Sequence, residues 1–381
     1  MMIVKRVLVT AMTTALVLGS AAVATASASD ERIGGPHRTA TSVAISQEAF
    51  PHGADVAVLV HADSFPDALV AGAAAGALQA PVLLSGKGII PDAVVAELDR
   101  LNPDEIILVG GPLALSRRIE VQAAAWGTVT RLGGENRYDT ARIVASQLTK
   151  RVGSASVAYL ASGAIFPDAL SGGVAAALDG APLLLTEPDR LSVETAAHLK
   201  AMSPERIVIL GGPAAISASV ASTAGKIAPV KRLAGADRFA TSRAVSAATF
   251  PSADTVLLTN GYNYPDGLSG TPLAVAKDAP ILLVLSKTVP ATVCTEIRRL
   301  APDKVVALGG KQAKWCIQLL RCKSRQADVT DVPGVLAARR RRRINGLIDD
   351  DSNGCRVTVG FTGIEVQKVN PAAVDFPHQN S

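Results

Sequence analysis

The chain has 381 residues, with 38 Lys and Arg against 33 Asp and Glu, so its formal net charge is only +5. Apolar residues make up 48% and aromatic residues 3%, so the core must be built from Ala, Val, Leu and Ile. This composition argues against a largely disordered chain and favours thin layers of helix on sheet. Beyond the N-terminus no apolar run approaches the roughly 20 residues that span a bilayer, which excludes a multipass membrane protein.

Residues 1–28 have the layout of a secretory signal peptide. Lys5 and Arg6 form a short positive region, residues 7–24 are apolar or small, and three overlapping small-x-small sites end at Ala28. We expect cleavage close to this point and a mature chain that works outside the cytoplasm, where disulfides persist. The alternative is an uncleaved membrane anchor, which the short and Ala-rich stretch disfavours.

Four motifs recur three times in the same order. An eleven-residue motif reads RIGGPHRTATS at 32–42, RLGGENRYDTA at 131–141 and RLAGADRFATS at 232–242. It is followed each time by FPDAL or YPDGL, by APVLL, APLLL or APILL, and by a Gly-Gly pair, which starts at residues 110, 211 and 309. A period near 100 residues is too long for a solenoid repeat and suits a small domain. The sequence therefore predicts three homologous domains, at 29–130, 131–231 and 232–319.

The second repeat shows the predicted elements most clearly. In chain order they are a strand, an Ala-rich helix, a strand, a helix and a strand, at Val157–Leu160, Asp168–Leu178, Leu183–Leu185, Val193–Met202 and Arg206–Leu210. Strands that are apolar on both faces and alternate with helices are typical of a parallel sheet covered on both sides. The fold class is therefore α/β, with one parallel sheet in each domain.

The repeat pattern fails after Ala313, so we expect the third domain to lack its last helix. Residues 320–381 resemble nothing upstream and carry an Arg run at 339–343 and three consecutive Asp at 349–351. Such charge runs predict a disordered or poorly packed tail. Whether the tail reflects a change of reading frame or a true extension stays open.

The Gly-Gly pairs and the Pro-Asp motifs have simple structural interpretations. No Lys-Ser/Thr follows the glycines and no Gly-x-Gly-x-x-Gly opens a helix, so they are expected to turn the chain from strand to helix. Pro is preset for the first helical position, and Asp67, Asp168 and Asp266 would complement the helix dipole. A contact between domains or with a ligand is the alternative for these Asp residues.

Each repeat opens with two Arg six residues apart, and the second lies beside a helix N-terminus. Guanidinium groups bind phosphate or carboxylate bidentately, and an exposed helix N-terminus adds N–H donors. The alternative is that these Arg pair with Asp of a neighbouring domain and hold the assembly together. Both interpretations stay open for Arg32 and Arg38, Arg131 and Arg137, and Arg232 and Arg238.

Catalytic and metal-binding patterns are missing from the sequence. The five His show no zinc-ligand spacing, no Gly-x-Ser-x-Gly elbow occurs, and the four Cys form no C-x-x-C. We therefore predict no catalytic residue, metal or cofactor, and the small basic excess fits nucleic acid poorly.

A disulfide between Cys294 and Cys316 is predicted from the repeat. The counterparts of these residues in the second repeat, Ala196 and Ala218, fall on a helix and just beyond the Gly-Gly turn, which are neighbours in a parallel α/β layer. Pairing of Cys294 with Cys322, or two buried thiols, are the alternatives.

Together these motifs resemble the cell wall-binding repeat 2 family over about 32–313. The resemblance implies three Rossmann- or toprim-like domains packed as a pseudo-threefold triangle in a secreted, cell wall-associated protein of a Gram-positive bacterium. It also implies noncovalent binding to an anionic wall polymer, either teichoic-acid-like or a secondary wall polysaccharide. The first repeat departs from the family in having Thr39 where an aromatic residue is expected. The residues implicated by position are Arg32, Arg38, Arg131, Arg137, Arg232, Arg238, Pro81, Leu83, Leu84, Pro182, Leu184, Leu185, Pro280, Leu282 and Leu283.

Two functions follow as expectations. The first is a wall-polymer binding module, for anchoring or surface-layer assembly, without catalysis of its own. The second is a wall hydrolase of the N-acetylmuramoyl-L-alanine amidase type, or an accessory to one, which such repeats often accompany. A hydrolase would need a zinc site or a nucleophile–base pair. No membrane contact is expected after signal cleavage.

Overall fold

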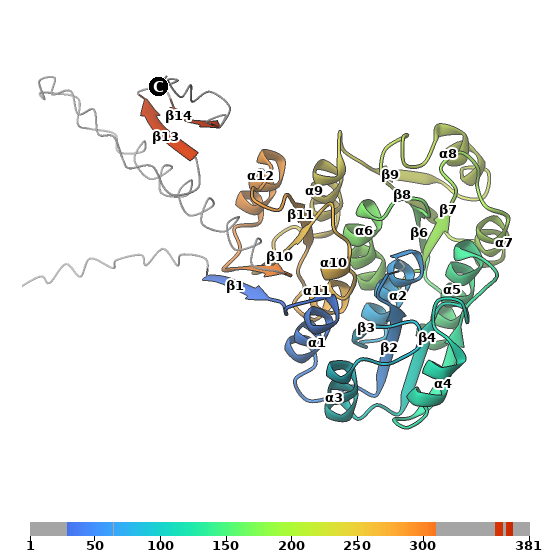
Figure 1. Cartoon of the computed structure of the whole chain (residues 1–381). Coiled ribbons are helices and arrows are strands. Elements are labelled where there is room, and N and C mark those ends of the chain that lie inside the picture. The colour runs from blue at the N-terminus through green and yellow to red at the C-terminus, as the bar shows by residue number, and fades with distance from the viewer. Residues whose placement is uncertain (1–28, 64, 310–354, 361–362, 369–381) are drawn as a thin grey trace, which may run out of the picture. The chain divides into compact units, whose positions relative to one another are not determined.

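Three parallel sheets of four strands, each alternating with helices, form the repeats of the chain in this computed structural model (Figure 1). The structure describes residues 29–63, 65–309, 355–360 and 363–368. The predicted signal peptide and most of the predicted tail lie outside these residues. Contacts divide the chain into one unit at 1–327, which holds all three sheets, and a second at 328–381.

The first sheet has the strand order β3-β2-β4-β5, and the second repeats it as β7-β6-β8-β9. The first comprises β2 (Val56–His61), β3 (Val82–Ser85), β4 (Glu105–Val109) and β5 (Thr128–Leu132), with helices α1 (Arg38–Ala49), α2 (Phe65–Ala77), α3 (Asp92–Leu101) and α4 (Arg117–Ala123). The second comprises β6 (Val157–Ser162), β7 (Leu183–Thr186), β8 (Arg206–Leu210) and β9 (Val230–Leu233), with α5 (Arg137–Val152), α6 (Pro167–Leu178), α7 (Val193–Met202) and α8 (Ala218–Ala224).

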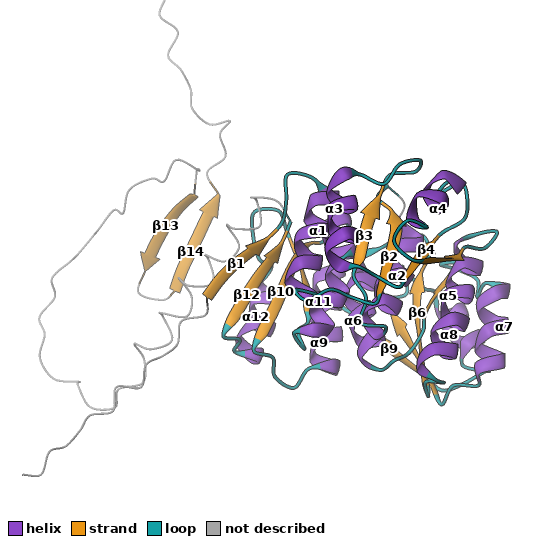
Figure 2. Cartoon of the chain, turned by 90° about the horizontal axis from the view of Figure 1, so that it is seen from below, coloured by secondary structure: helices purple, strands orange, loops and turns teal. Residues whose placement is uncertain are grey.

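The third sheet has the order β11-β10-β12-β1, so its fourth strand comes from the beginning of the chain. It comprises β10 (Thr255–Asn260), β11 (Ile281–Val284), β12 (Lys304–Leu308) and β1 (Ser29–Ile33), with α9 (Arg238–Thr249), α10 (Pro265–Leu268), α11 (Gly270–Ala276) and α12 (Ala291–Leu300). Figure 2 shows β1, β12 and β10 side by side. An ion pair between Glu31 and Lys304 joins the edge strand β1 to its neighbour β12.

The α/β architecture predicted from the sequence is confirmed. All five elements expected in the second repeat occur, with three bounds moved: β6 continues to Ser162, α6 begins at Pro167 and β7 continues to Thr186. Strands β3, β7 and β11 are buried along their whole length, because helices cover both faces of each sheet.

The eleven-residue motif belongs to two domains at once. Its first residues lie on β5, which pairs with β4 of the first sheet, whereas its last residues begin α5, which packs on β7 of the second. The boundary drawn from the repeat, at 130/131, therefore falls within a strand. In the same way, the third copy of the motif begins on β9 of the second sheet, and the first copy begins on β1 of the third sheet.

The three central helices explain the composition. Helices α2, α6 and α11 each contact the other two, so the domains meet in a closed cycle. Side chains must be small where three helices converge: a Cβ added at Gly76 would lie 2.9 Å from the Cβ of Ala177 and 3.1 Å from Cγ2 of Val275. The abundance of Ala and Gly, and the scarcity of aromatic residues, follow from this close approach.

Within the tail, the structure describes one antiparallel hairpin, formed by β13 (Cys355–Gly360) and β14 (Gly363–Lys368). In the described part of the chain, no helix combines the length and the apolar character that crossing a bilayer requires.

Candidate functional site

The sequence motifs converge at three junctions between domains, which we call junctions 1, 2 and 3. Open α/β sheets usually bind ligands beyond the carboxyl ends of their strands, where the strand order reverses. In the first sheet this place lies between β2 and β4, beside Asp67 in the first turn of α2 and Gly110 after β4. Here it receives Thr140 and Arg137 from α5 of the next domain.

A Thr hydroxyl links the two sides of each junction. It accepts a hydrogen bond from a glycine N–H of its own motif at 3.1 Å and donates one to the Asp carboxylate of the preceding domain. The groups are Gly134, Thr140 and Asp67 in junction 1, Gly235, Thr241 and Asp168 in junction 2, and Gly35, Thr41 and Asp266 in junction 3. Junction 3 joins the third domain back to the first.

Burial dominates the electrostatics of these carboxylates. It raises the pKa of Asp67, Asp168 and Asp266, while the Thr hydrogen bond and the nearby Arg charge act in the opposite direction. Asp168 is only 8% exposed. The Pro-Asp motif is thus a contact between domains, one of the alternatives considered from the sequence.

The first glycine of each Gly-Gly pair has a positive φ, +97° at Gly211 and +119° at Gly110. A Cβ at either position would also collide with the Asp carboxylate of the same junction. The expectation that these glycines turn the chain after a strand is therefore confirmed, and the turn also makes room for the buried Asp.

The first Arg of each pair clasps this glycine turn. Its Nη1 donates to the carbonyl oxygen of the glycine that ends the neighbouring strand: Arg131 to Gly110 at 3.0 Å, Arg232 to Gly211 at 2.7 Å, and Arg32 to Gly309 at 2.8 Å. Arg131 also pairs with Glu120 at 2.9 Å, and burial lowers the pKa of Arg232. These three guanidinium groups hold strand ends within one sheet, a structural role whose partners are glycine carbonyl oxygens and not the Asp of a neighbouring domain considered from the sequence.

The second Arg of each pair fixes the loop that follows the central strand of its own domain. Nη1 donates to the carbonyl oxygen of Ala62 from Arg38, of Gly163 from Arg137, and of Gly261 from Arg238. Each of these Arg also lies near the buried Asp of the preceding domain. All three side chains keep partial or full exposure to solvent.

The residue after this carbonyl differs in each domain, a difference that the sequence analysis missed. Asp63 forms an ion pair with Arg38 at 2.6 Å, Ala164 stands at the equivalent position in the second domain, and the ring of Tyr262 lies 4.2 Å from Arg238 in the third. Aligning the three repeats at the strand end, and not only at their shared motifs, would have found it.

The loop after the central strand also explains why the first repeat has Thr39 where the other two have an aromatic residue. Tyr138 and Phe239 pack so closely on Gly163 and Gly261 that a Cβ at either glycine would lie under 3 Å from the ring. In the first domain the loop residue is Ala62, whose Cβ takes up this space, and the smaller Thr39 stands in place of the aromatic residue.

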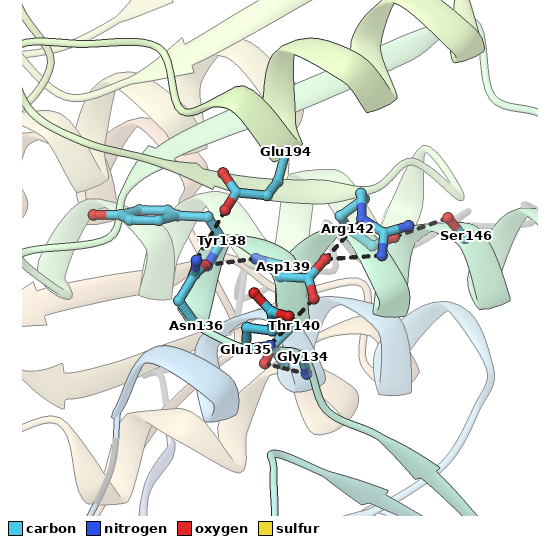
Figure 3. A network of polar contacts seen from close by, with 9 residues as sticks. All are labelled: Gly134, Glu135, Asn136, Tyr138, Asp139, Thr140, Arg142, Ser146 and Glu194. Atoms are coloured by element: carbon cyan, nitrogen blue, oxygen red, sulfur yellow. Dashed lines mark hydrogen bonds and ion pairs between the residues drawn. The ribbon is translucent and has the colours of Figure 1, made fainter.

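The N-terminus of α5 is capped from within the protein (Figure 3). Oδ1 of Asn136 accepts from the N–H groups of Tyr138 and Asp139, both at 2.9 Å, and Nδ2 of the same side chain donates to Glu194 on α7 at 2.8 Å. Asp139 also pairs with Arg142 at 2.8 Å. These N–H donors, expected from the sequence to serve a ligand, are used by the Asn136 cap instead.

The Pro-x-Leu-Leu segments lie in the core. Each Pro immediately precedes a strand and its carbonyl oxygen accepts from the neighbouring central strand, and the following residues are buried between sheet and helix. Because they expose almost no surface, their involvement in polymer binding stays a prediction. This applies to Pro81, Leu83, Leu84, Pro182, Leu184, Leu185, Pro280, Leu282 and Leu283.

Cys294 lies on α12 and is 4% exposed, while Cys316 is outside the described residues. The disulfide between them therefore stays a prediction. Among the described residues, no three His, Cys, Asp or Glu side chains are grouped so that they could hold a metal ion.

Comparison with protein families decides the classification. The model of cell wall binding domain 2 (CWB2) matches residues 32–120, 131–221 and 232–314. The chain belongs to the CWB2 family. The resemblance inferred from the motifs is thereby confirmed, and the chain is placed among cell wall binding proteins.

Curated relatives carry this region as part of longer chains. The chain is 33% identical over 255 residues to an amidase enhancer of Bacillus subtilis, covering 67% of this chain and 34% of the relative. It is 31% identical over 254 residues to the N-acetylmuramoyl-L-alanine amidase LytC of the same organism, covering 66% and 50%. The chain thus spans a third to a half of the length of these relatives.

Solved structures confirm the fold. Cwp6 from Clostridium difficile superposes with a TM-score of 0.73 at 28% identity, covering 77% of this chain and 47% of that one. Cwp8 from the same organism gives a TM-score of 0.71 at 28% identity, covering 78% and 52%.

Proposed function

We propose that this chain is exported and attaches noncovalently to the bacterial cell wall by binding an anionic wall polymer. The observation that carries the proposal is CWB2 membership across all three repeats, each of which presents an Arg at its strand ends with partial or full exposure. The signal-peptide layout of residues 1–28 supports export. A teichoic-acid-like polymer or a secondary wall polysaccharide would supply the anionic groups.

The geometry suits a repeating ligand. Arg38, Arg137 and Arg238 occupy equivalent positions in three domains that contact one another in a cycle, and each is anchored to the carbonyl oxygen of a loop. A polymer with regularly spaced charges could engage more than one domain, and linked contacts raise the overall affinity above that of each contact alone. An anchored guanidinium also loses less conformational freedom on binding.

Sedimentation with purified cell walls tests this proposal. The chain is mixed with intact walls and with walls freed of anionic polymer by hydrofluoric acid, at 0.05 to 0.5 M salt. We expect binding to intact walls that weakens with salt, because exposed charges are screened over roughly 8 to 10 Å near physiological ionic strength. Equal binding to stripped walls would refute an anionic receptor.

Arg137→Gln sharpens the test, with Arg206→Gln as the matched control. Arg206 is also exposed, but it begins β8 and so lies at the amino edge of the second sheet, opposite the loop that Arg137 holds. We expect weaker wall binding from the first variant alone, measured well below its melting temperature so that a loss of stability does not mimic a loss of contact. Equal binding by both variants would exclude Arg137 from the interface.

An accessory role beside an amidase is the second candidate. It is favoured by the match to relatives named as an amidase enhancer and an amidase over about two thirds of this chain. The test is the release of soluble fragments from peptidoglycan by an added amidase, with and without this chain. Faster release with the chain present supports this role, and release by the chain alone would make it a hydrolase.

A further inference from the structure

Tyr262 is a large exposed side chain that is held in place. It is 62% exposed and follows β10 at the carboxyl edge of the third sheet. Its backbone N–H donates to Oδ1 of Asn260 at 2.8 Å, its ring meets that of Phe239 edge-on at 5.9 Å, and the Arg238 guanidinium lies over it at 4.2 Å. A ring held by two side chains, on a backbone that is itself hydrogen-bonded, presents apolar surface to a ligand at little entropic cost.

The backbone is shaped for this arrangement. A Cβ at Gly261 would lie 2.9 Å from the Phe239 ring and 3.2 Å from Cδ of Arg238, so only glycine lets the loop approach both side chains. The equivalent of Tyr262 is Asp63 in the first domain and Ala164 in the second. The exposed aromatic platform is therefore particular to the third of these three domains.

Polar groups surround the platform. The Asn260 amide donates to Oγ of Ser286 at 2.8 Å, which ties the loop after β10 to the loop after β11. Lys287 follows in that second loop and is exposed. The carboxyl edge of this sheet thus carries an amide, a hydroxyl and a guanidinium group in the two linked loops around the Tyr262 ring, and an exposed lysine in the second of these loops.

This combination matches the chemistry of an acidic sugar. The C–H face of a pyranose packs on an aromatic ring, its hydroxyl groups exchange hydrogen bonds with amide and hydroxyl side chains, and a carboxylate or phosphate substituent is attracted by the cations. A neutral apolar ligand would leave the polar groups unused, and an isolated anion would leave the ring unused.

We propose that Tyr262, with Arg238, Asn260, Ser286 and Lys287, forms a saccharide subsite that accepts one pyranose bearing a carboxylate or a phosphate. The subsite rests on the proposed function, because the wall polymer is the source of such a sugar. It adds to that proposal that the third domain makes the contact, that the ring of Tyr262 packs on the sugar, and that the sugar carries a carboxylate or a phosphate.

Ligand-observed NMR on the full chain provides the test. Saturation transfer and titration are measured with methyl β-D-glucuronide, glucose 6-phosphate and methyl β-D-glucoside. We expect binding of one or both charged sugars and weaker binding of the neutral one. Tyr262→Ala should raise the dissociation constant about 3- to 10-fold, and Tyr262→Phe, which keeps the ring, should stay within about twofold.

Two outcomes overturn the subsite: equal affinity of wild type and Tyr262→Ala for every sugar, or no preference for the charged sugars. Melting curves of both variants exclude unfolding as the cause of any loss. Sedimentation with intact walls separates the two proposals. Wall binding by Tyr262→Ala at the wild-type level refutes the subsite and leaves the proposed function standing, whereas absence of wall binding by wild type refutes the proposed function itself.

Discussion

Replacing Arg232 with Met removes the clasp of junction 2 while keeping most of the aliphatic stem. The guanidinium donates to Gly211 O at 2.7 Å and to Ser217 O at 3.4 Å, so one strong and one marginal hydrogen bond are lost. A hydrogen bond from a charged group contributes about 1.5–3 kcal/mol, and partial exposure of Arg232 places the total near the lower end, at about 2 kcal/mol. For a unit of this size each kcal/mol shifts the melting temperature by roughly 2–4 °C, which gives a decrease of about 4–8 °C.

Differential scanning calorimetry of the purified chain measures this decrease. Arg190→Met is the matched control, because Arg190 is 72% exposed and pairs with Glu187 on the surface, where ion pairs stabilise little. We expect its melting temperature to equal that of wild type within error. If Arg232→Met melts together with the control, the first arginines are not staples and the interpretation of all three clasps is wrong.

Four further predictions concern the junctions, the ion pair between Glu105 and Arg151, and the cysteines. Burial raises the folded-state pKa of Asp168, so the stability of wild type relative to Asp168→Asn should rise as pH falls through that pKa. Arg151 lowers the pKa of Glu105 below its ordinary value of 4.5, so the advantage of wild type over Glu105→Gln should instead be lost as pH falls below that value; melting from pH 8 to 3 must give opposite slopes. Gly211→Ala should lower the melting temperature sharply by forcing a Cβ onto the Asp168 carboxylate, whereas Gly88→Ala, with open space around it, should not; equal effects would contradict the packing argument. Non-reducing peptide mapping should recover Cys294 linked to Cys316, and a free thiol or a link to Cys322 would refute the disulfide.

Local patterns predicted the elements of this fold because each strand and helix is encoded by nearby residues. Apolar runs gave the strands of the second repeat, and the Pro-Asp start gave the beginning of α6 within a residue. The order of the strands in a sheet is not a local property. Nothing in the sequence around Arg32 indicates that its strand pairs with Lys304–Leu308 at the far end of the described repeats.

The arginines illustrate the same limit at the candidate site. Their six-residue spacing indicated that both were important, but carbonyl partners such as Gly211 and Gly261 carry no sequence signal as acceptors. The Leu-Leu segments were implicated through the resemblance alone, and burial shows that they pack in the core. Tyr262 was missed because it falls where the repeats differ, while the analysis followed what they share.

Closure of the third sheet by β1 imposes an order on folding. Proteins are synthesised from the N-terminus, so β1 is among the first strands to leave the ribosome and its partner β12 is the last strand of the three sheets. The first and second sheets can form as soon as their own strands and the next motif have been made, because the strands of each sheet lie within one continuous stretch of the chain, Val56–Leu132 and Val157–Leu233. The third must instead close a loop that contains the other two domains, a step that depends on those domains having already brought the two ends together. Strand β1 therefore has no partner until the chain has been made through Leu308. The third domain can form only after the first two domains have folded.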